Sequence, residues 1–276
     1  MKALLDGDVL VYRIGFASEK TLYWVDIGDG IEVSFRTAKE AKEHGEVIRT
    51  EVDTMPLSFA IELLHNTIDK ILEDTKSDEY ILYLTGKGNF REGVAKTVPY
   101  KGNRSGKKPV HYQALRDYMI DELGAALVEG QEADDEMASS QAKDTVIATI
   151  DKDLLQCPGK HYDIATGRKI LSKDPGELKI EGNKCIGTGF KFFCYQVLVG
   201  DTVDNYKGIP NVGCKKGYGI LKDCKSERDC WKAVLKAYRE RKLKYSYLYE
   251  QASLAYIRRI RGETVKRFID RVVYLR

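Results

Sequence analysis

Residues 145–153 read Thr-Val-Ile-Ala-Thr-Ile-Asp-Lys-Asp, an apolar run that closes on two acids. A short run of β-branched and apolar residues stopped by polar ones predicts a buried strand over Thr145–Ile150. Similar runs occur at Lys2–Leu5, directly before Asp6, and at Tyr80–Leu84. Because segments with helical spacing separate these runs, we expect an α/β fold with a mainly parallel central sheet.

Four clusters of acids punctuate the chain, and two of them follow predicted strands. Their candidate members are Asp6, Glu132, Asp134, Asp135, Asp151, Asp153, Asp201 and Asp204. Ligand sites of parallel sheets gather at the carboxyl ends of the strands, and carboxylate oxygens suit Mg²⁺ or Mn²⁺. Each cluster alone has a plainer interpretation, namely acids that cap a helix or a turn. If the clusters converge, their mutual repulsion would require cations between them.

Basic residues are concentrated in two tracts. From Lys87 to Arg116 there are eight Lys or Arg against one acid, and from Lys232 to Arg276 thirteen against four. Because the rest of the chain is net acidic, these two tracts predict a basic surface that binds a polyanion. Solvated helix faces are the alternative, especially for the second tract. The first tract is rich in Gly and lacks periodicity, so we expect a mobile loop or arch at about 89–115.

Composition argues against several classes of protein. No apolar run approaches the roughly 20 residues of a membrane span, so no membrane partner is expected. Asp6 comes too early for a secretory signal. The six cysteines form no C-x-x-C pair and no zinc-like spacing with His, which predicts a reduced, cytoplasmic setting and argues against zinc.

The remaining patterns place further elements. Alternating residues around Gly28-Asp29-Gly30 predict a hairpin, and a helix is expected to follow Pro56. Acids at the start of 132–143 suggest another helix. Beyond a boundary near Gly189, we expect a helix over Phe190–Val199 and then basic amphipathic helices.

Five segments together carry a family resemblance. They are Leu4–Gly7 (LLDG), Tyr100–Arg104 (YKGNR), Glu132–Asp135 (EADD), Thr149–Gln156 (TIDKDLLQ) and Gly200–Pro210 (GDTVDNYKGIP). In this order and spacing the chain resembles the phage-type 5′ nucleases of the flap-endonuclease superfamily. The resemblance implies a PIN-like catalytic domain over 1–189 with a basic arch at about 89–115. A helical helix–three-turn–helix region for DNA binding would span 190–276.

The resemblance also implies an activity. It predicts a 5′→3′ exonuclease and structure-specific flap endonuclease that hydrolyses DNA phosphodiesters to 5′-phosphorylated products, in phage DNA replication or degradation within a bacterial host. All eight acids would surround two Mg²⁺ or Mn²⁺ ions, with Asp6, Asp153 and Lys101 in catalytic roles. Duplex ends, nicks and 5′ flaps would be the DNA partners; protein partners are not indicated.

DNA contacts are expected from the basic tract and from a hairpin between two helices. The candidates are Arg13, Tyr100, Lys101, Arg104, Gly208, Gly213, Lys215 and Lys216. Tyr100 could stack on a base, and the glycines would let the backbone approach a phosphate. In the family such a hairpin often holds K⁺. A helix-capping turn is the alternative for this hairpin.

Two departures from the family pattern leave alternatives open. Gly86 stands where the family usually carries another acid, so one ligand is missing or supplied elsewhere. The segment 21–50 has no counterpart in the minimal pattern. An RNase H-like, primer-removing nuclease acting on RNA–DNA hybrids, a PIN-type ribonuclease and a catalytically weakened DNA-junction binder therefore remain as competing functions.

Overall fold

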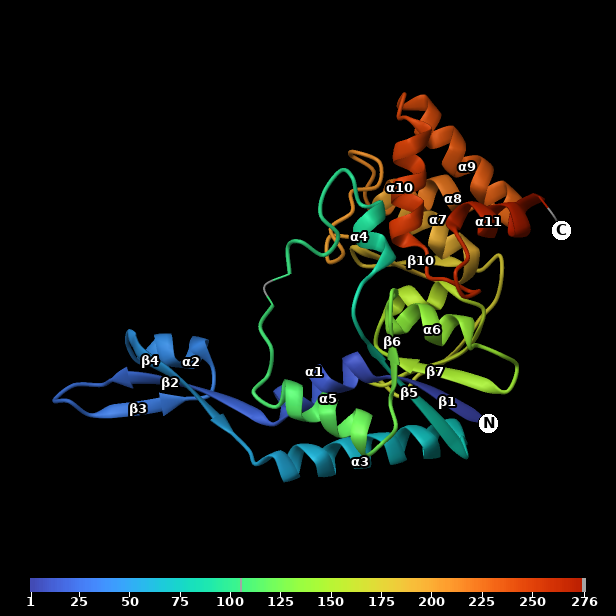
Figure 1. Ribbon diagram of the computed structural model, residues 1–276. Helices are drawn as coiled ribbons and strands as arrows, with labels where there is room; N and C mark the ends of the chain where they lie inside the picture. The colour runs from blue at the N-terminus through green and yellow to red at the C-terminus, as the bar shows by residue number, and fades with distance from the viewer. Residues whose placement is uncertain (105, 275–276) are drawn as a thin grey trace. The chain divides into compact units, whose positions relative to one another are not determined.

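The computed structural model describes residues 1–104 and 106–274, and its largest sheet has six strands in the order β6-β5-β1-β7-β8-β9 (Figure 1). These strands are β1 (Lys2–Asp6), β5 (Glu79–Thr85), β6 (Ala126–Val128), β7 (Thr145–Thr149), β8 (Gly159–Asp163) and β9 (Lys169–Ser172). Neighbours from β6 to β8 pair in parallel, and β9 pairs antiparallel with β8. The predicted mainly parallel sheet is confirmed.

The central position of β1 and β7 follows from their composition. Every residue of β7 is buried, and so are residues 3–6 of β1. Strands covered on both faces need apolar side chains at consecutive positions, and both segments supply them. The register aligns Leu5 of β1 with Ala148 of β7, so the two strands end at the same edge of the sheet.

Helices and a hairpin occupy the rest of the first compact unit, which comprises 1–6, 71–106 and 125–276. They are α4 (Phe90–Val94), α6 (Ala133–Ser139), the 3₁₀ helix η1 (Lys152–Gln156), β10 (Leu178–Glu181), β11 (Lys184–Gly187), α7 (Gly189–Val199), α8 (Cys214–Leu221), α9 (Glu227–Glu240), α10 (Tyr245–Ala255), α11 (Val265–Ile269) and the π-helix η2 (Asp270–Tyr274). Strands β10 and β11 form an antiparallel pair. The helix predicted over Phe190–Val199 is confirmed as α7.

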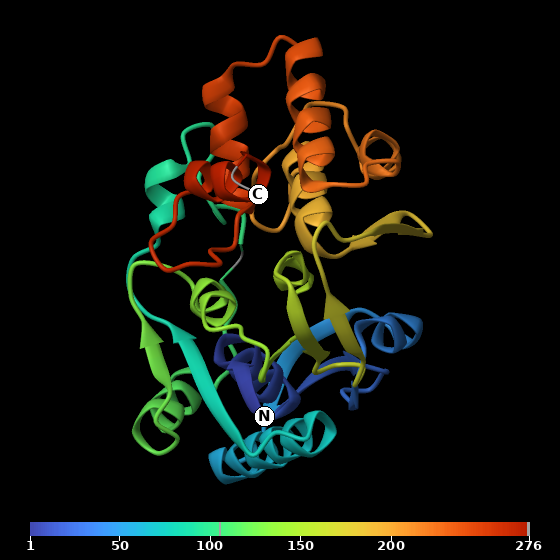
Figure 2. The ribbon, with the colours of Figure 1, turned by 90° about the vertical axis from the view of Figure 1, so that its right-hand side faces the viewer.

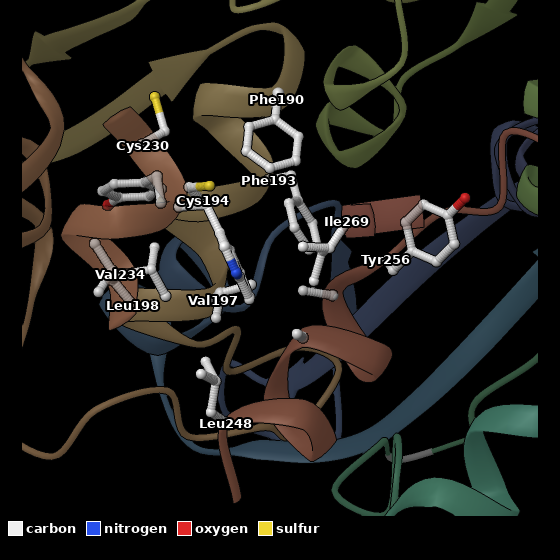
Figure 3. Close-up of a cluster of buried hydrophobic side chains, with 14 of the residues drawn as sticks. Phe190, Phe193, Cys194, Val197, Leu198, Cys230, Val234, Leu248, Tyr256 and Ile269 are labelled. Atoms are coloured by element: carbon white, nitrogen blue, oxygen red, sulfur yellow. The ribbon is translucent and has the colours of Figure 1, made fainter. Parts of the chain in front are cut away.

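Helix α7 is the centre of a second hydrophobic core. Its residues 189–198 are all buried, and the helices α8, α9 and α10 contact it. Figure 3 shows Phe190 and Phe193 of α7 facing the same cluster as Tyr256 and Ile269. Trp231 of α9 stacks on Phe193, with ring centroids 6.4 Å apart. Burial of these large side chains fixes the helical region.

The second compact unit comprises 7–70 and 107–124. It contains α1 (Gly7–Ala17), β2 (Glu19–Asp26), β3 (Glu32–Phe35), α2 (Ala38–His44), β4 (Val47–Thr54), α5 (Tyr112–Asp121) and most of α3 (Leu57–Thr75). The three strands form a sheet in the order β3-β2-β4. The predicted hairpin is confirmed: Gly28, Asp29 and Gly30 all have positive φ in the turn, a conformation that glycine adopts without strain.

Several predicted boundaries differ from the structure. Helix α6 ends at Ser139, four residues before the predicted end. The two compact units do not divide the chain near Gly189, and a functional boundary there stays a prediction. The expected arch at about 89–115 includes α4, passes from the first unit to the second, and contains residue 105, which lies outside the described residues. Among the described residues, no helix is both long and apolar enough to span a membrane.

Candidate active site

Carboxylates from three separate segments meet in one small cavity of the first unit. The cavity has a volume of about 20 Å³, and its acidic lining residues are Glu132, Asp134, Asp151, Asp153 and Asp204. Glu132 and Asp134 lie at the start of α6, Asp151 and Asp153 follow β7, and Asp204 precedes α8. Three of the four predicted acid clusters therefore line the same cavity.

Asp6 supplies the fourth cluster from the end of β1. Its side chain is buried and accepts a 2.6 Å hydrogen bond from Thr149 Oγ1 at the end of β7. The same Thr149 oxygen accepts the backbone N–H of Asp151 at 3.0 Å. Asp151 in turn caps η1, because its Oδ1 accepts the backbone N–H of Asp153 at 2.8 Å. Pairing of β1 with β7 thus brings Asp6 to the Asp151 cluster.

The electrostatics of the cavity show strong repulsion between carboxylates. Desolvation, followed by the charges of Asp6, Asp151 and Glu132, raises the pKa of Asp134 well above its ordinary range. Desolvation likewise raises the pKa of Asp151, with Asp204 adding to the effect. These mutual effects demonstrate that the acids are close enough to influence one another.

Asp153 is the acid of this cluster whose raised pKa lies near neutral pH. Desolvation and then the neighbouring Asp151 raise the pKa of Asp153 to about 7, although Lys152 opposes the shift. A group that changes charge near neutral pH would make the binding of a cation beside it sensitive to pH in the physiological range.

Basic and phenolic groups cover one side of the acid cluster. Tyr100 Oη lies 2.9 Å from a carboxylate oxygen of Glu132 and 2.8 Å from one of Asp204, so its single O–H group can donate to either acid. Lys101 Nζ donates to Glu132, and Arg104 Nη2 donates to Asp204 at 2.8 Å. Lys101 also has a positive φ of 54° and donates its backbone N–H to the Asp204 carbonyl at 3.0 Å. The predicted residues Tyr100, Lys101 and Arg104 therefore do gather at the acids.

Asp135 differs from its neighbours in the EADD segment. It is completely buried, and Arg91 donates to both of its carboxylate oxygens, at 2.7 and 2.9 Å. It also accepts the backbone N–H groups of Glu132 at 3.2 Å and of Arg258 at 2.9 Å. With both oxygens bonded inside the protein, Asp135 fixes the start of α6 rather than lining the cavity.

Lys152 is a further basic residue bonded to the acid cluster, and the sequence analysis did not identify it. Its Nζ lies 3.0 Å from an oxygen of Asp153 and 3.0 Å from an oxygen of Asp201. Although desolvation opposes it, this lysine lowers the pKa of Asp201. The position of Lys152 between the two acids of the Asp-Lys-Asp run was a usable signal. Arg91, in contrast, carries no local signal of its buried partner.

The donor set fits a hard divalent cation in chemistry. The acidic lining residues of the cavity are all Asp or Glu, and the buried Tyr206 Oη on its lining has no hydrogen-bond partner within 1–104 and 106–274. Over those residues, however, no three His, Cys, Asp or Glu side chains are arranged to hold a metal ion as they stand. Lys101 and Lys152 are bonded to these carboxylates instead.

The two glycines of the predicted DNA-binding hairpin differ: the N–H of Gly208 is bonded within the protein, whereas Gly213 has open space beside it. Gly208 has a φ of 59°, and its N–H donates to Gln251 Oε1 at 2.8 Å, so this amide is used within the protein. Gly213 precedes α8 and has open space beside its Cα. Exposed Lys215 and Lys216 line a cavity of about 320 Å³ with it, and Lys216 Nζ donates to the Asn211 carbonyl at 3.0 Å.

One predicted DNA-binding residue, Arg13, lies in the second unit. Arg13 is exposed on α1. Asp8, the other acid beside Asp6 in sequence, accepts a 2.7 Å hydrogen bond from Arg116 of the same unit. Neither residue lines the acid cavity of the first unit.

The position of Gly86 also has a structural explanation. A Cβ at Gly86 would lie 2.7 Å from Glu129 Oε1 and 2.8 Å from the Val128 carbonyl. Glu129 Oε2 accepts the backbone N–H of Lys87 at 2.8 Å. A carboxylate is therefore present at the end of this strand pair, but it comes from the β6 side and not from β5.

These features define an α/β fold in which a cluster of carboxylates lies at one edge of the sheet. Lysine and arginine side chains surround these carboxylates. No family model matches the chain. Its sequence is 26% identical over 230 residues to DNA polymerase I of Lactococcus lactis subsp. lactis (strain IL1403), which covers 75% of this chain and 25% of that protein. It is 27% identical over 177 residues to the 5′-3′ exonuclease of Buchnera aphidicola subsp. Schizaphis graminum (strain Sg), which covers 60% of each chain.

Solved structures give the same result for the fold. The T5 D15 protein co-crystallised with metal ions has a TM-score of 0.56 at 15% identity, covering 92% of this chain and 88% of that one. A pseudo-enzyme–product complex of the bacteriophage T5 flap endonuclease with DNA and metal ions has a TM-score of 0.53 at 15% identity, covering 98% and 97%. The fold is of this PIN-like type, and the sequence is similar to these 5′ nuclease-containing relatives, in the direction that its motifs predicted.

Proposed function

We propose that this chain is a metal-dependent 5′→3′ exonuclease and flap endonuclease that hydrolyses DNA phosphodiesters to 5′-phosphorylated products. The observation that carries the proposal is the convergence of Glu132, Asp134, Asp151, Asp153 and Asp204 on one cavity, with Asp6 close enough to raise the pKa of Asp134. Buried acids that repel one another this strongly favour a bound cation.

The chain's own residues divide into three roles in this proposal. Asp6, Glu132, Asp134, Asp151, Asp153, Asp201 and Asp204 would hold two Mg²⁺ or Mn²⁺ ions. When bound, these ions supply positive charge that polarises a phosphate and stabilises the charge that develops on it. Asp135 would position α6 through Arg91 and would not itself be a ligand.

The lysines bonded to the acids have a defined place in this proposal. Lys101 forms an ion pair with Glu132, and Lys152 forms ion pairs with Asp153 and Asp201. In the reaction, Lys101 would stabilise negative charge on the scissile phosphate. Arg104 contacts an adjacent phosphate, and Tyr100 stacks on a base near the cut after leaving Glu132 and Asp204.

Duplex binding is assigned to the hairpin before α8. Gly213, Lys215 and Lys216 are exposed, and amides at a helix start favour phosphate. Contacts of this kind carry no sequence information, so binding should depend strongly on salt and weakly on sequence. The aligned part of the chain spans 25% of the polymerase relative and 60% of the exonuclease relative. K⁺ at the hairpin, a role in phage replication and a cytoplasmic site of action remain predictions.

A cleavage assay tests the proposal against its alternatives. Flapped, nicked and blunt DNA duplexes, each labelled at the 5′ or the 3′ end, are incubated with Mg²⁺ or EDTA, and product lengths are read on a gel. The proposal predicts Mg²⁺-dependent cleavage from the 5′ side. Selective cleavage of an RNA–DNA hybrid would favour the RNase H-like alternative. Tight junction binding without any cleavage would favour the junction binder.

A further inference from the structure

A second, larger cavity lies next to the acid cluster in the first unit. It has a volume of about 430 Å³ and is bounded by β7, β8, β9, η1, the β10–β11 hairpin and α7. Figure 2 shows this hairpin beside α7, in the amber part of the ribbon. Asp151 lines both this cavity and the acid cavity. Small-molecule pockets of proteins have volumes of about 300–1,000 Å³, so this space is large enough for a ligand.

The walls of the cavity are mainly apolar. Leu155, Ile170, Leu178 and Ile186 line it, and Phe192 adds an aromatic ring. Apolar walls with a few placed polar groups are typical of sites that take a planar organic ligand.

His161 is, with Thr149, one of the buried polar residues on the lining of this cavity. The residue is only 3% exposed and lines the space. Its Nε2 lies 2.9 Å from the Cys157 carbonyl, which can only accept, so Nε2 carries the proton. Nδ1 is buried and has no hydrogen-bond partner in the part of the chain that the structure describes. A buried polar atom without a partner calls for an explanation, and a ligand is one.

The tautomer sets the chemistry of that ligand. Burial lowers the pKa of His161, so the ring stays neutral at physiological pH. With the proton on Nε2, Nδ1 offers a lone pair and can only accept. A matching ligand must present an N–H or O–H group to the inner wall.

Charge on the lining argues against an anion as the deep part of the ligand. The charged residues that line the cavity are three acids and three bases, namely Asp151, Asp163, Glu177, Lys152, Arg168 and Lys179. Lys152 is bonded to Asp153 and Asp201, and Lys179 to Glu181 at 2.9 Å. The cavity therefore presents no excess of positive charge to a buried phosphate.

We infer that this cavity binds an unstacked nucleobase, whose N–H group donates to His161 Nδ1. A nucleobase is planar, has apolar faces and carries N–H donors on its edge, which matches the walls and the acceptor. The choice of a nucleobase over other planar donors rests on the proposed function, because Asp151 places the cavity beside the acids assigned to phosphodiester chemistry. The base can come from a free nucleoside or from an unpaired nucleotide of a DNA strand.

A pair of matched ligands tests the hydrogen bond directly. Binding of deoxyadenosine and of N6,N6-dimethyldeoxyadenosine is measured by calorimetry and ligand-observed NMR in EDTA, where no divalent ion can recruit a ligand to the acids. The dimethyl compound keeps the sugar and the purine ring but lacks the N–H donors. We expect it to bind about tenfold more weakly, because its complex leaves Nδ1 unsatisfied. Equal affinities of the two compounds would overturn the inference.

Three variants locate the binding. His161→Phe removes the acceptor and should bind both compounds equally. Ile186→Trp fills the cavity from the partly exposed hairpin, where folding is at less risk, and should abolish binding of both. Leu171→Trp adds the same bulk at a side chain of β9 that is 59% exposed and does not line the cavity, and should bind like the wild type. Unchanged selectivity in folded Ile186→Trp would overturn the inference.

A DNA arm distinguishes the two sources of the base. A 5′-flap substrate carrying one unpaired adenine is compared, in EDTA, with substrates carrying N6,N6-dimethyladenine or an abasic site there. Weaker binding of both replacements assigns the pocket to the strand; selectivity for the nucleosides alone assigns it to free ligand. If Mg²⁺-dependent flap cleavage is present while neither test shows selectivity, the pocket is refuted and the proposed function stands. If deoxyadenosine binds selectively but no DNA is cleaved, the proposed function fails separately.

Discussion

Arg91 and Asp135 form a doubly hydrogen-bonded ion pair in which the two side chains are 2% and 0% exposed. The same guanidinium donates to the carbonyl of Tyr256 at 2.6 Å, just beyond α10. One buried arginine therefore joins α4, the start of α6 and the end of α10. Because Glu132 and Asp134 lie at the start of α6, this pair positions two acids of the proposed metal site.

Removal of Arg91 should cost much stability. Arg91→Met leaves Asp135 as an unpaired buried charge, and breaking a buried pair in this way costs about 3–5 kcal/mol. The measurement is urea unfolding of the wild type and the variant. Arg49→Ala is the matched control, since Arg49 pairs with Glu32 at 2.8 Å while both side chains are more than 40% exposed. It should lose at most about 1 kcal/mol. Similar losses in the two variants would contradict the positioning role.

The raised pKa of Asp153 predicts a pH effect on metal-free stability. Between the ordinary Asp pKa of about 3.9 and the folded value of about 7, the folded protein holds a proton at Asp153 that the unfolded chain has lost. This group's contribution therefore weakens as pH rises through that window. In EDTA, the Tm of wild type relative to Asp153→Asn should fall from pH 5 to pH 8, and Mg²⁺ should reverse the fall. A relative Tm independent of pH would refute the shift.

Lys101 is expected to act on the chemical step. Lys101→Ala should slow single-turnover cleavage in Mg²⁺ by about a hundredfold, with a much smaller change in DNA affinity. The reason is that its ammonium group stabilises charge that develops only in the transition state. Arg104→Ala serves as the comparison, because Arg104 is half exposed and assigned to binding. A wild-type single-turnover rate for Lys101→Ala would remove this residue from the mechanism.

The hairpin lysines are expected to govern duplex affinity. Replacement of Lys215 and Lys216 by Ala should weaken binding and reduce the slope of log K against log salt by about two, one for each lost phosphate contact. Titrations at several salt concentrations in EDTA provide the slope. The pair Lys39 and Lys42 on α2 offers a control with the same loss of charge. A salt slope unchanged by the hairpin substitutions would count against their phosphate contacts.

Local sequence patterns were enough to predict the sheet and most of the acids of the cavity, because each strand end and its acids are adjacent in sequence. Asp6 and Asp151 follow buried strands and meet where β1 pairs with β7. The different roles of Asp134 and Asp135 were not predictable, since adjacent helix residues point about 100° apart and only tertiary structure decides which one meets Arg91. Arg91 lies 44 positions from Asp135, and no local spacing indicates such a pair.

The larger cavity and the Glu129 carboxylate were unpredictable for a related reason. The cavity walls come from three strands, a hairpin and two helices, which assemble only in the folded chain. Gly86 alone suggested a lost acid, whereas the structure shows a carboxylate from the β6 side at the same place.

The central claim is that the acid cluster binds divalent cations for DNA cleavage, and one paired measurement on Asp153→Asn tests it most directly. Cleavage of a 5′-flap substrate is followed under single-turnover conditions in Mg²⁺, and binding of the same DNA is measured in EDTA. We predict that the variant binds DNA like the wild type and cleaves it orders of magnitude more slowly. Equal cleavage by the variant and the wild type in Mg²⁺ would contradict the account.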